Sequence, residues 1–345
     1  MRKFLIKISY TVLPVWLFFV GMATYLWVTD DNAGDLMRLG LINSGPGYTD
    51  SIRDIIFQQI YYTGQEEDSL MRADTADVVV IGDSFSHGGG VGKEGDYVNY
   101  LAHDSGRKVV VFTPMDPAIA NPMQVAYDAM KLGVLDSVNA PNLVIQEGER
   151  YLVTRHSQFV TTDTVVPHSA PRKAAADGGA KQEASPLLRV KDYFFYHLFG
   201  ANPIYKERLN RPMFTGGEPD QLYFYNEDVK YGFDITPQQQ REIVDCFNQV
   251  IAMAREKGIN LIIIVACDKY DLYQDYIVDN PYPRKTLVED VERWMAPQGD
   301  RFVYAKRVLL PCVERGDKDV FLFNDTHWSP VSSGLIAAEV IKKLK

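Results

Sequence analysis

Four short runs of apolar, mostly β-branched residues constrain the fold of this chain more than any other feature. They are Asp77–Ile81, Lys108–Phe112, Asn142–Gln146 and Asn260–Ala266. Each run is too short for a helix, and continuous apolar strands are what a parallel sheet covered on both faces requires. Helical patterns alternate with these runs, over Tyr97–Ser105, Pro122–Leu135, Pro237–Lys257 and Gly334–Leu344. The sequence therefore predicts an α/β fold with a doubly wound, mostly parallel sheet, a three-layer sandwich.

Composition excludes several classes of protein. The chain has 345 residues, of which 46% are apolar, which is enough to bury one large core. Its formal net charge of −9 argues against a nucleic-acid partner, which would need a basic face. Three scattered cysteines, Cys246, Cys267 and Cys312, are too few for a metal cage or a disulfide framework. We expect no metal and no cofactor.

The N-terminal region predicts a membrane anchor. Ile8–Val28 carries no charge and spans roughly 30 Å as a helix, the thickness of a bilayer core. Arg2, Lys3 and Lys7 precede the run and Asp30 follows it, so the N-terminus should stay in the cytoplasm. This predicts a single-pass inner-membrane protein whose folded part is periplasmic. A cleavable signal peptide is the alternative, and it also exports the chain.

The expected organisation follows from these patterns. Residues 1–7 form a cytoplasmic tip, 8–28 the transmembrane anchor, 29–75 a stalk with a leading helix, and 76–345 one α/β domain. The leading helix is predicted from apolar residues at helical spacing within Ser51–Tyr62. A flexible insertion is expected at 161–185, because that stretch has almost no large apolar side chains to offset its ordering entropy.

Polar residues follow each predicted strand, where an open parallel sheet gathers its functional groups. Ser84 comes directly after the first strand, at a tight turn where backbone N–H groups of Ser84 and Phe85 could stabilise an oxyanion. A serine nucleophile needs a base and a group that orients the base. Among six histidines, His327 has an aspartate, Asp325, two residues earlier. These three residues are the predicted catalytic set.

A glycine-rich stretch offers a competing motif. Gly90–Gly95 formally matches G-x-G-x-x-G, and Asp116 lies at about the expected distance beyond it. However, eight residues separate the end of the strand from the first glycine, so the spacing argues against a turn that would bind a pyrophosphate. We interpret these glycines as giving the chain room to pass beside an active site.

Several segments together resemble a known superfamily. GDSFS after the first strand and a late DTHW are similar to the SGNH (GDSL-type) hydrolases, and more closely to membrane-anchored polysaccharide acetyltransferases of the alginate O-acetyltransferase and DHHW-like kind. Val144–Leu152 resembles their W-E-x-x-E-R-Y-L stretch, and Asp268–Tyr273 resembles P-D-K-Y-x-x-Y. The resemblance runs from about Val78 to Ile341. In the alginate enzymes the Asp-His motif precedes the serine motif, whereas here it follows.

The resemblance implies roles for the candidate residues. Ser84 would be the nucleophile, His327 the general base and Asp325 the residue that orients it. The implied reaction is transfer of an acetyl group to a hydroxyl of an exported polysaccharide, with the acyl donor supplied by a multi-spanning membrane acyltransferase. Asn121, in the loop after the second strand, is a candidate oxyanion donor.

The remaining candidates would face the substrate. Arg150, Lys269 and Tyr270 suit an acidic or hydroxylated sugar, and Trp328 joins them as a candidate. A structural role is the alternative, for instance an ion pair of Arg150 with Glu147 or Glu149. Two other functions stay open at this point: an exported carbohydrate or acyl esterase, and a polysaccharide-binding assembly subunit without catalysis.

Overall fold

The computed structural model describes residues 2–28, 36, 57–62, 76–91, 93–114, 121–133, 135, 141–161, 204–216 and 218–345. The helices and strands, in chain order, are α1 (Arg2–Val28), β1 (Gln58–Tyr62), β2 (Val78–Ile81), η3 (Ser84–Ser86), α2 (Tyr97–Ser105), β3 (Val109–Pro114), α3 (Pro122–Lys131), β4 (Asn142–Gly148), α5 (Glu149–Arg155), η5 (His156–Gln158), β5 (Ile204–Arg208), β6 (Gln221–Tyr225), η6 (Asn226–Val229), α7 (Pro237–Glu256), β7 (Asn260–Ala266), α8 (Lys269–Tyr273), η7 (Gln274–Tyr276), α9 (Leu287–Trp294), η8 (Ala296–Arg301), β8 (Phe302–Tyr304), α10 (Ala305–Arg315) and α11 (Pro330–Ile341).

The main sheet has the order β1-β3-β2-β4-β7-β8, and every neighbouring pair is parallel. Without the edge strand β1, the order along the chain is second, first, third, fourth, fifth, as in flavodoxin-like doubly wound sheets. The residues of β2 and β4 are all buried, because helices cover both faces of the sheet. The predicted fold class is confirmed.

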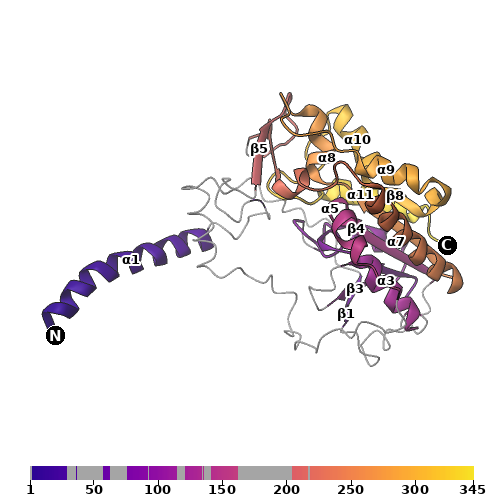
Figure 1. Cartoon of the computed structure of the whole chain (residues 1–345), viewed down its shortest axis with the longest axis horizontal. Helices are drawn as coiled ribbons and strands as arrows, with labels where there is room; N and C mark the ends of the chain where they lie inside the picture. Colours follow the sequence, from indigo (N-terminus) through magenta and orange to yellow (C-terminus); the bar gives the residue numbers. More distant parts are fainter. Residues whose placement is uncertain are drawn as a thin grey trace.

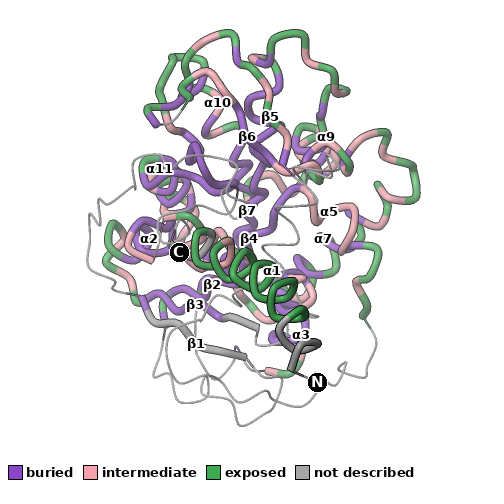
Figure 2. The backbone as a smooth tube through the Cα atoms, turned by 90° about the vertical axis from the view of Figure 1, so that its left-hand side faces the viewer, coloured by how far each residue is buried: buried purple, intermediate pink, exposed green. Residues whose placement is uncertain are grey.

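Helices form a layer on each side of the sheet (Figures 1 and 2). α3 and α7 pack against each other on one face, and α2, α10 and α11 pack on the other. The buried tube of β2, β3, β4 and β7 lies between these layers (Figure 2). The core is therefore centred on the sheet, whose strands β2, β4 and β7 are almost entirely buried.

The predicted leading helix is wrong where the structure describes it. Gln58–Tyr62 forms the parallel edge strand β1, with Ile60 opposite Phe112 of β3. The apolar spacing within Ser51–Tyr62 fits a helix, but the backbone donors and acceptors along the open edge of β3 are satisfied by a strand. Residues 51–56 lie outside the described residues, as does the predicted insertion apart from Thr161. The proposed domain boundaries stay predictions.

A second, two-stranded sheet was not predicted. β5 and β6 pair antiparallel, with Tyr205 opposite Phe224, and β6 contacts α8 beyond the carboxyl end of β7. Aromatic rings of this hairpin pack on the tyrosines that follow β7, with 5.3 Å between the ring centroids of Phe224 and Tyr270. The hairpin thus covers one end of the main sheet.

Helix α1 is long and apolar enough to cross a membrane. Its apolar stretch Lys7–Tyr25 has a mean hydropathy of 1.5, and none of it is buried against the rest of the protein. In Figure 1, α1 extends away from the sheet and its helices. These properties are consistent with a single-pass anchor.

Candidate active site

Ser84 lies at a tight turn directly after β2. Gly82 is the first residue after the strand, and a Cβ there would lie 2.1 Å from Ser86 Oγ, so the turn requires glycine. Asp83 caps the short helix η3: its Oδ1 accepts a hydrogen bond from Phe85 N–H (3.1 Å), and its Oδ2 accepts one from Gly148 N–H (3.0 Å). Burial raises the pKa of the Asp83 carboxyl. The result is an exposed Ser84 on a turn fixed to the end of β4.

Gln146 of β4 supports the same turn from beneath. Its Oε1 accepts hydrogen bonds from Asp83 N–H (3.1 Å) and Ser86 Oγ (3.0 Å). Ser86 Oγ also lies 2.8 Å from Tyr97 Oη of α2. Sequence reasoning missed Asp83, Ser86 and Gln146 as supporting residues. The available signal was a glutamine at the end of the mostly apolar run Asn142–Gln146.

His327 reaches Ser84 from the far end of the chain. Its Nε2 lies 2.7 Å from Ser84 Oγ, and its Nδ1 is hydrogen-bonded to Asp325 Oδ1. Asp325 Oδ1 also accepts the backbone N–H of His327 (3.0 Å), which ties the carboxylate to the ring it contacts. Because a carboxylate can only accept, Nδ1 of His327 carries the proton and Nε2 is left to accept one from Ser84.

Two glycines of the loop after η3 pack against this pair. A Cβ on Gly89 would lie 2.4 Å from His327 Nε2, and one on Gly90 would lie 2.8 Å from Asp325 Cγ. Gly90 also has a φ of 73°, which favours glycine. The glycine-rich stretch thus gives the chain room beside the Ser84–His327–Asp325 set, and it does not form a nucleotide-binding turn.

The predicted oxyanion donors differ in whether their N–H groups are available to a ligand. No described residue accepts a hydrogen bond from Ser84 N–H, so this donor is available to a ligand. Phe85 N–H is not available, because it donates to Asp83 Oδ1. Asn121 is also wrong as a candidate: its Oδ1 caps α3 through Met123 N–H, and its Nδ2 donates to Arg155 O (3.2 Å).

Lys269 and Tyr270 do not face a substrate. Both are fully buried at the start of α8. Lys269 Nζ donates to the carbonyl oxygens of Leu322 (2.7 Å), Phe323 (2.9 Å) and Asp325 (3.1 Å). Tyr270 Oη donates to Pro283 O (2.9 Å). The predicted substrate contacts of these two residues are therefore wrong, because their polar atoms are directed into the protein.

Trp328 is also buried, with 2% of its surface exposed. Its ring centroid lies 4.5 Å from that of Phe85, whose ring in turn lies 4.6 Å from the imidazole of His327. Trp328 therefore packs the turn that carries Ser84 against the segment that carries His327. The structure gives it this packing role in place of the predicted substrate contact.

Arg150 has the structural role that was the alternative to substrate contact, with Asp268 and Asp228 as partners in place of the expected Glu147 or Glu149. Its Nε lies 3.3 Å from Asp268 Oδ1, and its Nη2 lies 3.5 Å from Asp228 Oδ1. Asp268 Oδ2 in turn lies 2.6 Å from Lys285 Nζ. Only 12% of the Arg150 side chain is exposed, and its guanidinium is directed at the buried carboxyl groups of Asp268 and Asp228.

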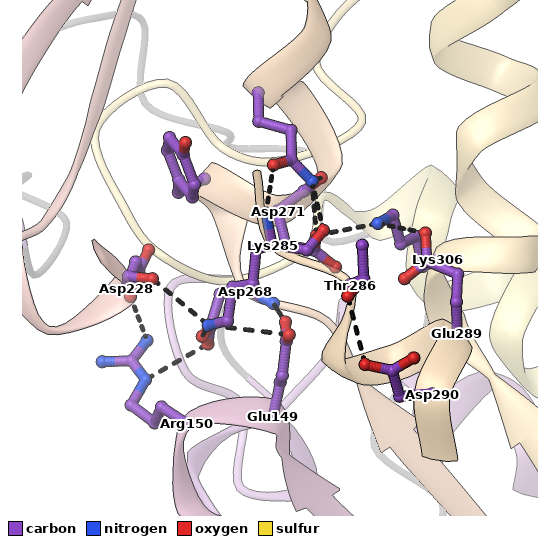
Figure 3. A network of polar contacts seen from close by, with 12 residues as sticks. Glu149, Arg150, Asp228, Asp268, Asp271, Lys285, Thr286, Glu289, Asp290 and Lys306 are labelled. Carbon is purple, nitrogen blue, oxygen red and sulfur yellow. Dashed lines mark hydrogen bonds and ion pairs between the residues drawn. The ribbon is translucent and has the colours of Figure 1, made fainter. Parts of the chain in front are cut away.

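These residues belong to a larger buried network beyond the ends of β4 and β7 (Figure 3). Its second half joins Lys306 Nζ to Asp271 Oδ1 (2.7 Å) and Glu289 Oε1 (2.6 Å). Burial raises the pKa of Asp271 to about 6, although Lys306 acts in the opposite direction. Burial also raises the pKa of Asp268, but Lys285 and Arg150 together hold it below its ordinary value. The network joins α5 and η6 to the start of α8, and joins α8 to α10 and α10 to α9.

The fold and the arrangement of the site residues together indicate a class of protein. A serine, a histidine and an aspartate hydrogen-bonded in that order at the carboxyl edge of a parallel sheet are the arrangement of serine-dependent hydrolases and acyltransferases. Residues 215–345 match the family model described as the SGNH hydrolase-like domain of acetyltransferase AlgX. The matched segment includes Asp325 and His327, and Ser84 lies upstream of it.

Over residues 215–345, this match confirms the suspected SGNH and AlgX-like resemblance, and it supports an activity of the acetyltransferase or esterase type. No curated protein and no solved structure matches the chain.

Proposed function

We propose that the protein transfers an acetyl group to hydroxyls of an exported polysaccharide through an acyl-Ser84 intermediate. One observation carries the proposal: His327 Nε2 lies 2.7 Å from Ser84 Oγ while Asp325 holds the other ring nitrogen. A nucleophile, a base and an orienting carboxylate are the groups that acyl transfer needs. The AlgX-type match supports acetyl as the group transferred.

The reaction proceeds in two steps, which are acylation of Ser84 and transfer of the acyl group to the acceptor. His327 Nε2 takes the proton of Ser84 Oγ, and Oγ attacks the carbonyl carbon of the donor. The donor's leaving group departs with the proton from His327, which leaves an ester on Ser84. His327 then deprotonates the acceptor hydroxyl, whose oxygen attacks this ester, and Ser84 Oγ leaves and regains its proton. Ser84 N–H is the available donor for the negative oxygen in both steps.

Hydrolysis is the second candidate, and the exposure of Ser84 favours it. Water that reaches the acyl-serine would compete with a sugar hydroxyl unless the bound polymer excludes it. The same residues then make an esterase. The product identifies which of the two functions applies, because only transfer gives an acetylated acceptor.

We also propose that α1 anchors the chain in the inner membrane with the sheet on the periplasmic side. Arg2, Lys3 and Lys7 lie at the end predicted to stay inside. An acyl donor outside the cytoplasm must cross the membrane, so a multi-spanning acyltransferase is the expected partner. Protease added to spheroplasts should digest the chain beyond residue 40, and full protection would reverse this orientation.

The test of function uses the full chain in detergent, an activated acetyl ester and an oligosaccharide acceptor. Mass spectrometry should find acetylated Ser84 without acceptor and acetylated sugar with it. Ser84→Ala should abolish both, whereas Ser157→Ala, at an exposed serine of η5, should leave both intact. Asp325→Asn should slow turnover roughly 10⁴-fold, because the imidazole loses its required tautomer.

Two other outcomes would overturn acetyl transfer to a sugar. Acetate with no acetylated sugar supports the esterase. If no acyl-serine forms, and cells carrying Ser84→Ala still acetylate and export the polymer normally, the chain is a binding or assembly subunit.

A further inference from the structure

Lys269 is unusual among the buried lysines in what it contacts. It lies in the first turn of α8, directly after the end of β7, and its surface is fully buried. Its Nζ donates to three carbonyl oxygens of one short segment, those of Leu322, Phe323 and Asp325, at 2.7, 2.9 and 3.1 Å. An ammonium has three N–H donors, so it can bond all three carbonyl oxygens at once.

The other two lysines that are buried in the described part of the chain bind carboxylates. Lys285 Nζ lies 2.6 Å from Asp268 Oδ2, and Lys306 Nζ lies 2.7 Å from Asp271 Oδ1 (Figure 3). Burial of a charge is unfavourable unless it is compensated, and Lys285 and Lys306 are compensated by opposite charge. Lys269 Nζ binds backbone carbonyls of one segment, which it gathers around one point.

The gathered segment is the one that carries the candidate base. Asp325 holds His327 through its carboxylate, and its backbone oxygen accepts one of the three hydrogen bonds that Lys269 donates. The segment closes on itself through a hydrogen bond from Leu322 N–H to His327 O (3.0 Å). Fixing its carbonyls therefore fixes where the His327 ring stands relative to β7.

We propose that Lys269 is a positioning residue for the acyl-transfer site, which holds the Asp325–His327 segment against the end of β7 so that His327 reaches Ser84. This inference rests on the proposed function and deepens it. Lys269→Met keeps the length of the side chain but leaves three buried carbonyls without their donor. The segment then shifts to find other partners, and the contact between His327 and Ser84 lengthens.

The test measures the reactivity of Ser84 with a fluorophosphonate, which labels an activated serine without needing the natural substrate. The rate of labelling is followed against pH on the full chain in detergent. Lys269→Met should label about 10- to 100-fold more slowly, the cost of an error of about 1 Å in placement. Its pH profile should shift, because His327 titrates in an altered contact with Asp325.

Lys306→Met is the matched control. It also removes a buried lysine, and it should lower the midpoint of urea unfolding while labelling at the wild-type rate with the wild-type pH profile. If Lys269→Met does not fold, Lys269→Gln, which retains two N–H donors but no charge, should label at a rate between wild type and the expected Met value.

The outcomes separate this inference from the function it rests on. A wild-type chain that the probe does not label at Ser84 overturns both. A labelled wild-type chain together with a folded Lys269→Met or Lys269→Gln variant that keeps the wild-type rate and pH profile overturns the positioning role alone. Slower labelling and a shifted profile in the Lys269 variants, and not in Lys306→Met, support it.

Discussion

At the scale of single residues, the candidate site depends on the lack of a side chain at Gly89 as much as on the side chains of its neighbours. His327 stands in contact with Gly89 on one side and with Ser84 on the other. The space for its ring exists because residue 89 has no Cβ. Ser84 and His327 lie 243 positions apart in the chain, so their approach is set by packing of this kind rather than by local sequence.

Gly89→Ala tests this steric requirement. The added Cβ would lie 2.4 Å from His327 Nε2, so the imidazole must move away from Ser84. We expect turnover and fluorophosphonate labelling to fall about 100-fold, because displacements of about 1 Å have such effects. The measurement is the initial rate with an activated acetyl ester.

Gly299→Ala is the control for Gly89→Ala, since nothing lies within 4 Å of a Cβ at that position. It should keep the wild-type rate. Equal rates for Gly89→Ala and wild type would mean that His327 is not held where the reaction needs it.

At the scale of helices and strands, the sequence predicts best where one local pattern decides. The run Asn260–Ala266 forms β7 with those bounds, because its six consecutive apolar residues, Leu261–Ala266, suit a strand buried on both faces. Strand β8 has only three residues, too few for any pattern, and it forms because β7 offers an unpaired edge. Residues 58–62 show the same effect of a neighbouring edge, which overrides helical spacing.

In the candidate site, too, some features could be predicted from the sequence and others could not. The order of strands and the edge at which their loops meet follow from the sequence, so the approach of Ser84 to His327 could be predicted; their catalytic roles stay predictions. The direction of each side chain could not. Lys269 and Tyr270 follow a strand as expected, but α8 turns both inward, where carbonyl groups and aromatic rings need partners. No local signal distinguishes a lysine that faces a ligand from one that closes a loop.

Helix α7 allows a prediction at this scale that is separate from catalysis. Thr236 Oγ1 accepts a hydrogen bond from Gln239 N–H, and Gln239 Oε1 accepts one from Thr236 N–H, so the helix begins with a capping box. Thr236→Ala should lower the free energy of unfolding by about 1 kcal/mol, measured by urea titration. Labelling of Ser84 should not change, and a loss of labelling at unchanged stability would contradict this separation.

At the scale of the whole molecule, the buried ionic network joins segments that are distant in the chain. Asp228 of η6, Arg150 of α5 and Asp268 after β7 meet in it, with Lys285 contributing from the segment before α9 (Figure 3). Such networks cost desolvation and depend on each partner keeping its charge state. Stability of the folded molecule should therefore depend on pH through these groups.

The raised pKa of Asp228 determines whether stability rises or falls with pH. Burial, reinforced by the negative charge of Asp268, raises its pKa from 3.8 to about 7, although Arg150 and Lys285 lower it. Between these two pH values the folded protein holds a proton that the unfolded chain releases. Stability from this group is complete below pH 3.8 and falls as pH rises toward 7, by at most about 1.4 kcal/mol per pH unit.

Asp228→Asn should remove this contribution, because an amide is neutral at every pH in the range. The free energy of unfolding, measured in urea at pH 4.5, 5.5, 6.5 and 7.5, should then decline less steeply for the variant than for wild type. Asp275→Asn, at an exposed carboxylate paired with Arg284, is the control and should keep the wild-type slope. Parallel slopes for wild type and Asp228→Asn would show that Asp228 is ionised throughout, held so by Arg150 and Lys285, and that the network is balanced without a bound proton.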